Sequence, residues 1–282
     1  MSVPSKEMSA PSKEKPSSAA WFSESLARGL AVLRIFSREH PRLSVSEVAE
    51  LTSLSRAAAR RYLLTLQDLG YVGAEDDKYY LRPRILDLGY GFLSSTGIEE
   101  LAEPILQDMA LRAEGASHLA VFDDWQVLIA ASVPSHRMRN FFTVAGGRMP
   151  AYVGSLGPVL LAWLPDATLK QYLARTNRKS FTEASLTREA DIVERLADVR
   201  AKGYAVNKGE YNEGIVGVAI PLRNRVGRVV AALNVNRFSA KLLRPDQIKK
   251  DLNVLRGAAA HLEAALQTSD KKGLSLESPL HA

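Results

Sequence analysis

Residues 23–82 most limit what this chain can fold into, because they hold three short helical patterns followed by a hairpin pattern. The first helix starts near Ser23 and must end before Pro41, since the residue preceding a proline avoids helical backbone angles. Its apolar residues recur at the spacing of one helix face, so we expect that face to be buried. The expected buried stripe consists of Leu26, Leu30, Leu33 and Phe36.

The second and third helices have recognisable starts and stops. Ser44-Val45-Ser46-Glu47 reads as a capping box, in which the serine and the glutamate satisfy each other's backbone N–H groups. A third helix is predicted from Arg56 to Leu69, where Gly70 stops it. Its buried stripe would be Ala59, Leu63 and Leu66. Next, residues 71–72 and 79–81 flank an Asp76-Asp77-Lys78 turn and predict a short β-hairpin. This order of elements is that of a winged helix-turn-helix.

The exposed face of the third helix has the chemistry of a DNA-reading surface. Arg56, Arg60 and Arg61 point away from the apolar stripe, and the guanidinium fork matches guanine edges and phosphates. Ala57 and Ala58 keep the first turn slim. Ser53 and Ser55 can cap the helix and approach a phosphate, and Lys78 at the hairpin tip can touch the flanking backbone, with Arg82 and Arg84 nearby. The predicted DNA-contacting set is Ser53, Ser55, Arg56, Ala57, Ala58, Arg60, Arg61 and Lys78. There are two alternatives to DNA binding. The arginines could form an ordinary solvated helix face, or the winged helix could bind another protein.

The rest of the chain predicts an α+β domain. Pro83 opens a linker helix over 83–97, and residues 98–267 follow with a helix near 98–114. Strands are expected at 117–122, 126–132, 215–222 and 228–235, and further helices at about 155–163, 188–202 and 244–266. The last two strands form a hairpin, which favours an antiparallel sheet. Residues 1–22 and 268–282 lack an apolar pattern and are predicted to be disordered tails.

Composition excludes several function classes. There is no cysteine, so disulfides and thiolate metal sites are ruled out, and the composition fits a reducing cytoplasm. The longest apolar run is far too short to cross a bilayer, and the first thirty residues lack the apolar core of an export signal. The net charge of +6 is compatible with a polyanionic partner but is shared by many enzymes.

A catalytic site is not recognisable in the sequence. The five histidines are scattered, and neither a Gly-x-Ser-x-Gly elbow nor a glycine-rich phosphate loop is present. Ser155 begins a helix without an evident base and is read as a helix cap. No metal or other cofactor is predicted, and the chain is expected not to be an enzyme, an unrecognised enzyme of aromatic catabolism being the alternative.

Three segments of the N-terminal region give a specific resemblance: residues 26–33, 46–49 and 54–66, the last containing Leu-Ser-Arg-Ala-Ala-Ala-Arg-Arg. They resemble the IclR family of bacterial regulators, and in particular its branch that controls protocatechuate, 4-hydroxybenzoate and β-ketoadipate catabolism. Residues 80–89 match the wing and linker helix of that branch. The likeness continues through 156–162 and 227–235 to about residue 266, so it covers nearly everything but the tails.

The resemblance implies a GAF-like effector-binding domain, with a pocket between the sheet and residues 149–157. The expected effector-binding residues are Ser155, Leu156, Asn207, Gly217, Asn234, Asn236, Arg148 and Tyr152. The helix start near Ser155 is expected to offer an anion seat, and Asn234 and Asn236 share one sheet face. Arg137 and Arg139 also flank the pocket segment, whereas His118 is expected in the core, and Trp163 in the core or an interface.

This sequence departs from many relatives at two of these places. They have Asp at the position of Asn207, and Arg-Cys or Arg-Ser where Val216-Gly217 stand here. The departures are expected to open space at Gly217 and to change which ligand fits, which makes a benzoate-type ring plausible.

The resemblance further implies a transcription regulator that dimerises through the N-terminal domain and linker helix, often pairing into a tetramer. Its expected partners are a palindromic double-stranded operator and an aromatic carboxylate effector. Effector binding would shift the population between two placements of the domains and so alter how two recognition helices meet half-sites. A protein-interaction adaptor is the remaining alternative from another class.

Overall fold

The computed structural model describes the chain except residues 1–20, 38, 89–97, 136–143 and 270–282. The chain divides into two compact units, one ending at Phe92 and one beginning at Leu93. The predicted tails therefore lie almost wholly outside the described residues, as does most of the predicted linker helix. Among the helices that the structure describes, none combines the length and apolar character that a bilayer span requires.

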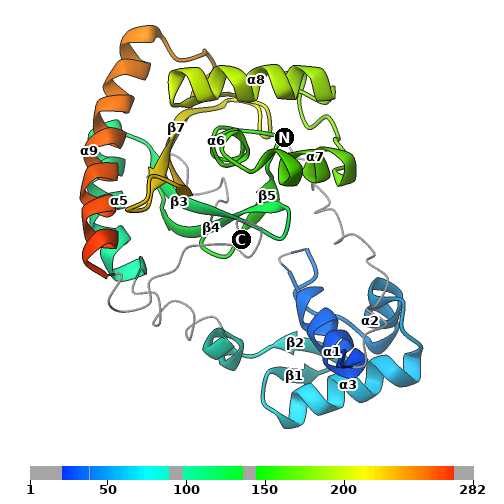
Figure 1. Cartoon of the computed structure of the whole chain (residues 1–282). Helices are drawn as coiled ribbons and strands as arrows, with labels where there is room; N and C mark the ends of the chain where they lie inside the picture. Colours follow the sequence, from blue (N-terminus) through cyan, green and yellow to red (C-terminus); the bar gives the residue numbers. More distant parts are fainter. Residues whose placement is uncertain (1–20, 38, 89–97, 136–143, 270–282) are drawn as a thin grey trace. The chain divides into compact units, whose positions relative to one another are not determined.

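The first unit is the predicted winged helix-turn-helix (Figure 1). Its elements are α1 (Glu24–Arg34), α2 (Val45–Thr52), α3 (Arg56–Asp68), β1 (Val72–Glu75), β2 (Lys78–Leu81) and the 3₁₀ turn η1 (Pro83–Ile85). The capping box of α2 is confirmed, because Ser44 Oγ accepts from the Glu47 N–H at 3.3 Å and Glu47 Oε2 accepts from the Ser44 N–H at 2.7 Å. The α3 stripe is also confirmed, since Ala59, Leu63 and Leu66 are buried.

The predicted stripe of α1 is partly wrong. Leu26 and Leu30 are 64% and 47% exposed, and Val32 is the residue of α1 that enters the core. The other two residues of the predicted stripe, Leu33 and Phe36, are half-buried and pack against this core, so the second half of the stripe is covered and the first half is not. The linker prediction is also modified at its start, where Pro83 opens a 3₁₀ turn before residues 86–88 become helical.

The second unit is built on a six-stranded antiparallel sheet in the order β5-β4-β3-β8-β7-β6. The strands are β3 (Ala116–Asp123), β4 (Gln126–Val133), β5 (Arg148–Pro150), β6 (Ala205–Lys208), β7 (Ile215–Arg223) and β8 (Val229–Phe238). The helices are α5 (Ile98–Ala113), α6 (Leu156–Ala162), α7 (Asp166–Arg175), α8 (Glu189–Lys202) and α9 (Pro245–Ser269). The α+β class and the antiparallel sheet are confirmed.

Helices cover both faces of this sheet, which is why its central strands are buried throughout (Figure 1). Helices α5 and α9 pack on one face, against Leu119, Val218 and Leu233. Helix α6 lies on the other face with α7 and α8 behind it, and its core includes Ala120, Ala219 and Ala232. We call this second face the α6 face.

Three elements escaped sequence prediction: β5, β6 and α7. The two strands have three and four residues and pair only at the edges of the sheet. A segment that short cannot display the alternation from which a strand is recognised, and it becomes a strand only because a neighbour supplies hydrogen bonds.

Candidate functional sites

Helix α3 presents three exposed arginines on the side away from its buried stripe. Arg56, Arg60 and Arg61 are exposed, and none forms an ion pair within the described part of the chain. The first turn holds no acidic residue, so the positive end of the helix dipole adds to the arginine charge. A depression on this surface is lined by Ala57, Arg60, Arg61, Leu64, Thr65 and Asp68. The arginines are therefore available to an anionic partner.

The two serines at the helix start have different roles. Ser55 is the N-cap of α3, and its Oγ accepts from the Ala58 N–H at 3.2 Å. Ser53 does not cap α3, contrary to the sequence prediction. It ends α2 in a left-handed conformation, with a φ of 56°. The turn between α2 and α3 needs this conformation to redirect the chain. Ala57 is exposed and Ala58 half-buried, so the first turn is slim as expected.

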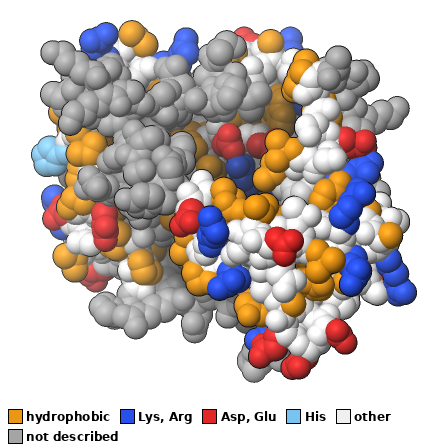
Figure 2. Space-filling model, turned by 90° about the horizontal axis from the view of Figure 1, so that it is seen from below, with side chains coloured by type: hydrophobic (Ala, Val, Ile, Leu, Met, Phe, Trp, Pro, Cys, Tyr) orange, Lys and Arg blue, Asp and Glu red, His pale blue; other side chains and the backbone are white. Residues whose placement is uncertain are grey.

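The hairpin of β1 and β2, which forms the wing, is less basic than the sequence predicted. Lys78 begins β2 opposite Glu75, and the turn residues Asp76 and Asp77 adjoin it. Arg84 stacks over the Tyr71 ring at 5.6 Å. Figure 2 shows one face of the molecule, on which basic side chains are interspersed with acidic and apolar ones. Overall charge therefore does not distinguish this face, whereas three exposed arginines lie together on α3.

A row of polar residues crosses the α6 face of the second unit. Asn236 of β8, Gly217 of β7 and Asn207 of β6 are directly opposite one another in neighbouring strands. On the next row, Asn234 of β8 lies opposite His118 of β3. Residues opposite each other in antiparallel strands share a face. The fold thus brings Asn207, Gly217, Asn234 and Asn236 of the predicted effector site together on one face. Arg148 of β5, by contrast, lies opposite Leu128, which packs on the other face of the sheet.

Asn234 and His118 are joined beneath this surface. Their side chains are buried, and His118 Nδ1 lies 2.8 Å from Asn234 Oδ1. Burial disfavours the imidazolium and lowers the pKa of His118 to about 4. A neutral ring must donate from Nδ1 to an amide oxygen, which fixes both the tautomer of His118 and the direction of the Asn234 amide.

Gly217 does not open space for a ligand, which corrects the sequence expectation. A Cβ at this position would lie 2.0 Å from Asn236 Oδ1 and 2.2 Å from the Val235 carbonyl oxygen. The side chain of Asn236 fills the room above the glycine. Asn236 Oδ1 is buried and has no hydrogen-bond partner among the described residues. The row therefore presents an unpaired acceptor instead of a void.

At the start of α6, Ser155 occupies the N-cap position, but its hydroxyl forms no capping hydrogen bond. The interpretation of Ser155 as a side-chain cap is therefore wrong. Its Oγ is buried and, within the described residues, unpartnered. Leu156 is part of the core, and the Tyr152 hydroxyl accepts from the Lys179 N–H at 2.8 Å and donates to the Lys179 carbonyl at 2.9 Å. The tyrosine thus holds the loop after α7.

Of the remaining predicted residues, two are hydrogen-bonded to other parts of the protein and two lie outside the residues that the structure describes. Asn207 Oδ1 accepts from the Gly209 N–H at 3.0 Å and so shapes the turn after β6. Arg148 on β5 pairs with the Asp123 carboxylate and donates to its carbonyl. Arg137 and Arg139 lie outside the described residues.

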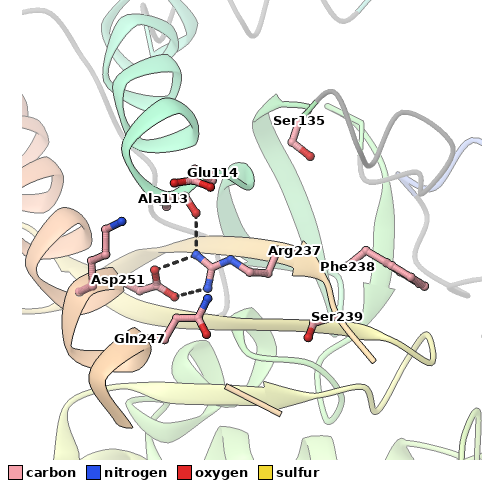
Figure 3. A pocket seen from close by; sticks show the side chains of 9 residues that line it. Ala113, Glu114, Ser135, Arg237, Phe238, Ser239, Gln247 and Asp251 are labelled. Atoms are coloured by element: carbon pink, nitrogen blue, oxygen red, sulfur yellow. Dashed lines mark hydrogen bonds and ion pairs between the residues drawn. The ribbon is translucent and has the colours of Figure 1, made fainter. Parts of the chain in front are cut away.

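A separate cavity of about 270 Å³ opens near the ends of α5 and β8 and the beginning of α9. Figure 3 shows Arg237 pointing between the Asp251 carboxylate and the carbonyl of Ala113. Both terminal guanidinium nitrogens are engaged there, with contacts of 2.7–2.8 Å. Sequence reasoning missed this group because nothing in the sequence links these three distant positions.

Comparison with known proteins agrees with this architecture. The family model described as the IclR helix-turn-helix domain matches residues 25–76, and that of the bacterial transcriptional regulator IclR C-terminal domain matches residues 90–264. The "Pca regulon regulatory protein" of Pseudomonas putida is 34% identical over 86% of this chain and 83% of its own length.

Two further relatives are similar over most of their length. The "p-hydroxybenzoate hydroxylase transcriptional activator" of Acinetobacter baylyi is 31% identical over 84% of this chain and 89% of its own. A crystal structure of a Rhodococcus sp. RHA1 protein described as a transcriptional regulator is 38% identical with a TM-score of 0.77, covering 88% of this chain and all of that one. The matched families and relatives are regulators of transcription and not enzymes. The chain belongs to the IclR family of bacterial DNA-binding transcriptional regulators.

Proposed function

We propose that this regulator reads its operator through α3 and changes its activity when a hydroxy-substituted aromatic acid binds on the α6 face. The observation that carries the first part is the group of exposed arginines on α3, which form no ion pair within the described residues and lie on a helix whose opposite side is buried. Arg56, Arg60 and Arg61 would meet bases and phosphates in the major groove, with Ser55, Ala57 and Ala58 at the helix start. Ser53 and Lys78 would flank the DNA backbone.

A double variant, Arg56→Ala with Arg60→Ala, tests the DNA surface. We expect operator affinity to fall at least about tenfold and the dependence of affinity on salt to become shallower, because base and phosphate contacts are both lost. Electrophoretic mobility shift at several salt concentrations measures both quantities. Arg225→Ala with Arg256→Ala removes the same charge from exposed positions of the second unit and is the matched control. Unchanged affinity and salt slope in the α3 variant would favour a protein-docking role for this surface.

The effector class follows from what the α6 face leaves unsatisfied. Ser155 Oγ and Asn236 Oδ1 are buried without partners among the described residues, and buried polar atoms normally have them. An amide oxygen needs a donor such as a ligand hydroxyl, whereas a serine hydroxyl can donate to a carboxylate. One relative is named as the activator of p-hydroxybenzoate hydroxylase, and p-hydroxybenzoate is a hydroxy-substituted aromatic acid. Asn207, Asn234 and Leu156 would complete the site, with Tyr152 holding the neighbouring loop after α7.

Thermal-shift measurements with small acids test the effector class. We expect 4-hydroxybenzoate or 3,4-dihydroxybenzoate to raise the melting temperature, because a ligand that binds only the folded state stabilises it. Benzoate, which lacks the ring hydroxyl, is expected to give a smaller shift. Ser155→Ala should reduce the response, and Ser46→Ala in the first unit should not. If neither these acids nor their ring-cleavage products shift the melting temperature, the aromatic class is wrong while DNA binding stands.

The mechanism we propose is a population shift within a dimer or a dimer of dimers. The domains would be 23–82 for DNA binding, 83–97 as linker helix and 98–267 for the effector, between tails 1–22 and 268–282. Exposed Leu26 and Leu30 on α1 support pairing through the first unit, since apolar side chains gathered at a surface mark interaction sites. A location in the cytoplasm follows from the proposed action on operator DNA.

A further inference from the structure

A buried ion pair lies directly behind the turn that carries Ser155. Arg195 of α8 and Glu210, in the segment between β6 and β7, are bonded through Nη1 and Oε2. Their side chains are only 14% and 4% exposed. Two charges withdrawn from water are costly unless further hydrogen bonds compensate them. The partners that supply this compensation are therefore informative.

Those partners are the backbone of Gly154. Its N–H donates to Glu210 Oε2 at 3.0 Å, and its carbonyl accepts from Arg195 Nη2 at 2.7 Å. Gly154 adopts a φ of 74°, a conformation that favours glycine. The ion pair thus holds both backbone polar groups of the residue that precedes Ser155.

The same guanidinium also reaches the other side of the proposed site. Arg195 Nη2 donates to the Val206 carbonyl at 3.0 Å, and Val206 directly precedes Asn207. Asn207 Oδ1 in turn accepts from the Gly209 N–H at 3.0 Å and the Glu210 N–H at 3.4 Å. One nitrogen atom therefore bridges the backbone immediately before Ser155 and immediately before Asn207.

We propose that Arg195 and Glu210 are positioning residues for the effector site, fixing the distance between Ser155 on the α6 turn and Asn207 on the sheet edge. The inference rests on the proposed effector site. It adds that this ion pair holds the turn before Ser155 and the backbone before Asn207 at a fixed separation. A side chain that bonds to a ligand is effective only when it is held close to the required position. Residues that do not themselves touch the ligand commonly hold it there. The pair itself does not touch the ligand.

The test uses the full chain with three variants. Glu210→Gln keeps an acceptor for Gly154 but leaves Arg195 without its anion. Arg195→Met combined with Glu210→Gln leaves no unpaired buried charge, so it preserves folding while removing the carbonyl bridge. Asp198→Asn breaks an exposed ion pair with Lys202 on the same helix and is the matched control. Hydrogen–deuterium exchange and titration calorimetry with 4-hydroxybenzoate are the measurements.

We expect peptides covering 151–157 and 206–211 to exchange faster in both variants at Glu210, with β3 and β4 unchanged. The affinity for 4-hydroxybenzoate should fall about tenfold, and operator affinity without effector should stay within about twofold of wild type. The Asp198→Asn control should match wild type in exchange rates, in affinity for 4-hydroxybenzoate and in operator affinity. Unchanged exchange at the two turns would overturn the proposal, as would faster exchange with unchanged ligand affinity. If wild type binds no acid, the effector class fails by itself, and the exchange data still decide whether the pair positions the two turns.

Discussion

At the scale of single residues, the α6 face depends on a histidine that stays neutral. His118 is buried beside Asn234, and its pKa of about 4 lies well below the 6.5 of an unfolded chain. At a pH between these two pKa values, His118 is protonated in the unfolded state and neutral in the folded state. Stability linked to His118 is therefore complete above pH 6.5 and is lost as the pH falls toward 4. The loss amounts to about 3 kcal/mol across the window.

His118→Asn should make the stability of the second unit less sensitive to acid. The asparagine amide nitrogen takes the place of Nδ1 and keeps a donor for Asn234 but cannot take up a proton, so the contribution tied to this titration disappears. We expect the free energy of unfolding, measured by urea denaturation from pH 7 to pH 4, to fall less steeply than in wild type. His261→Gln at an exposed position of α9 should retain the wild-type slope. Equal slopes in all three proteins would mean that His118 does not govern this titration.

At the scale of elements, the end of β8 joins two helices that are far apart in sequence. Arg237 binds the Asp251 carboxylate on α9 through two nitrogens and also the last carbonyl of α5, that of Ala113 (Figure 3). Asp251 is 1% exposed. Gly115 packs against the neighbouring backbone, because a Cβ there would lie 2.5 Å from the Asn236 carbonyl oxygen. This junction fixes the C-terminus of α5 on the sheet.

Asp251→Asn should destabilise the second unit by about 3 kcal/mol or more, because a buried cation loses its ionised partner. Urea denaturation followed by tryptophan fluorescence measures the change. Asp246→Asn removes an exposed partner of Arg244 near the start of the same helix and should leave the midpoint unchanged. A similar midpoint in both variants would show that the junction is dispensable.

At the scale of the whole molecule, the two units are connected through residues 89–97, and α5 begins directly after them. Effector and operator bind to different units of one chain under the proposed function. If each favours one state of a shared equilibrium, their binding free energies must be coupled, and the coupling must be equal in both directions.

A saturating effector should therefore change operator affinity by a factor of roughly 5 to 150, and saturating operator should change effector affinity by the same factor. Fluorescence anisotropy with labelled operator and calorimetry with 4-hydroxybenzoate give the two factors. An operator affinity that does not respond to a bound effector would exclude control through DNA affinity and place regulation in a later step of transcription.

Local signals made the DNA-binding unit predictable. The capping box at Ser44, the stripe of α3 and its exposed arginines depend on spacings of three or four residues, which the sequence displays directly. The exposure of Leu26 was not predictable, because a helix with an apolar stripe does not reveal how much of it a neighbour will cover. The role of Ser53 was missed because a left-handed turn residue and an N-cap serine look alike in sequence.

In the second unit, the sequence by itself determined the main strands, most of the helices and the family, together with most of the residues that share the α6 face. Only the tertiary structure decided that Asn236 covers Gly217 and that the Ser155 hydroxyl has no partner among the described residues. The same holds for Arg195, which bridges the backbone before Ser155 and before Asn207. The physical reason is range. Helix and strand periodicity arises between near neighbours along the chain, whereas these contacts join residues that only the packing of distant segments brings together.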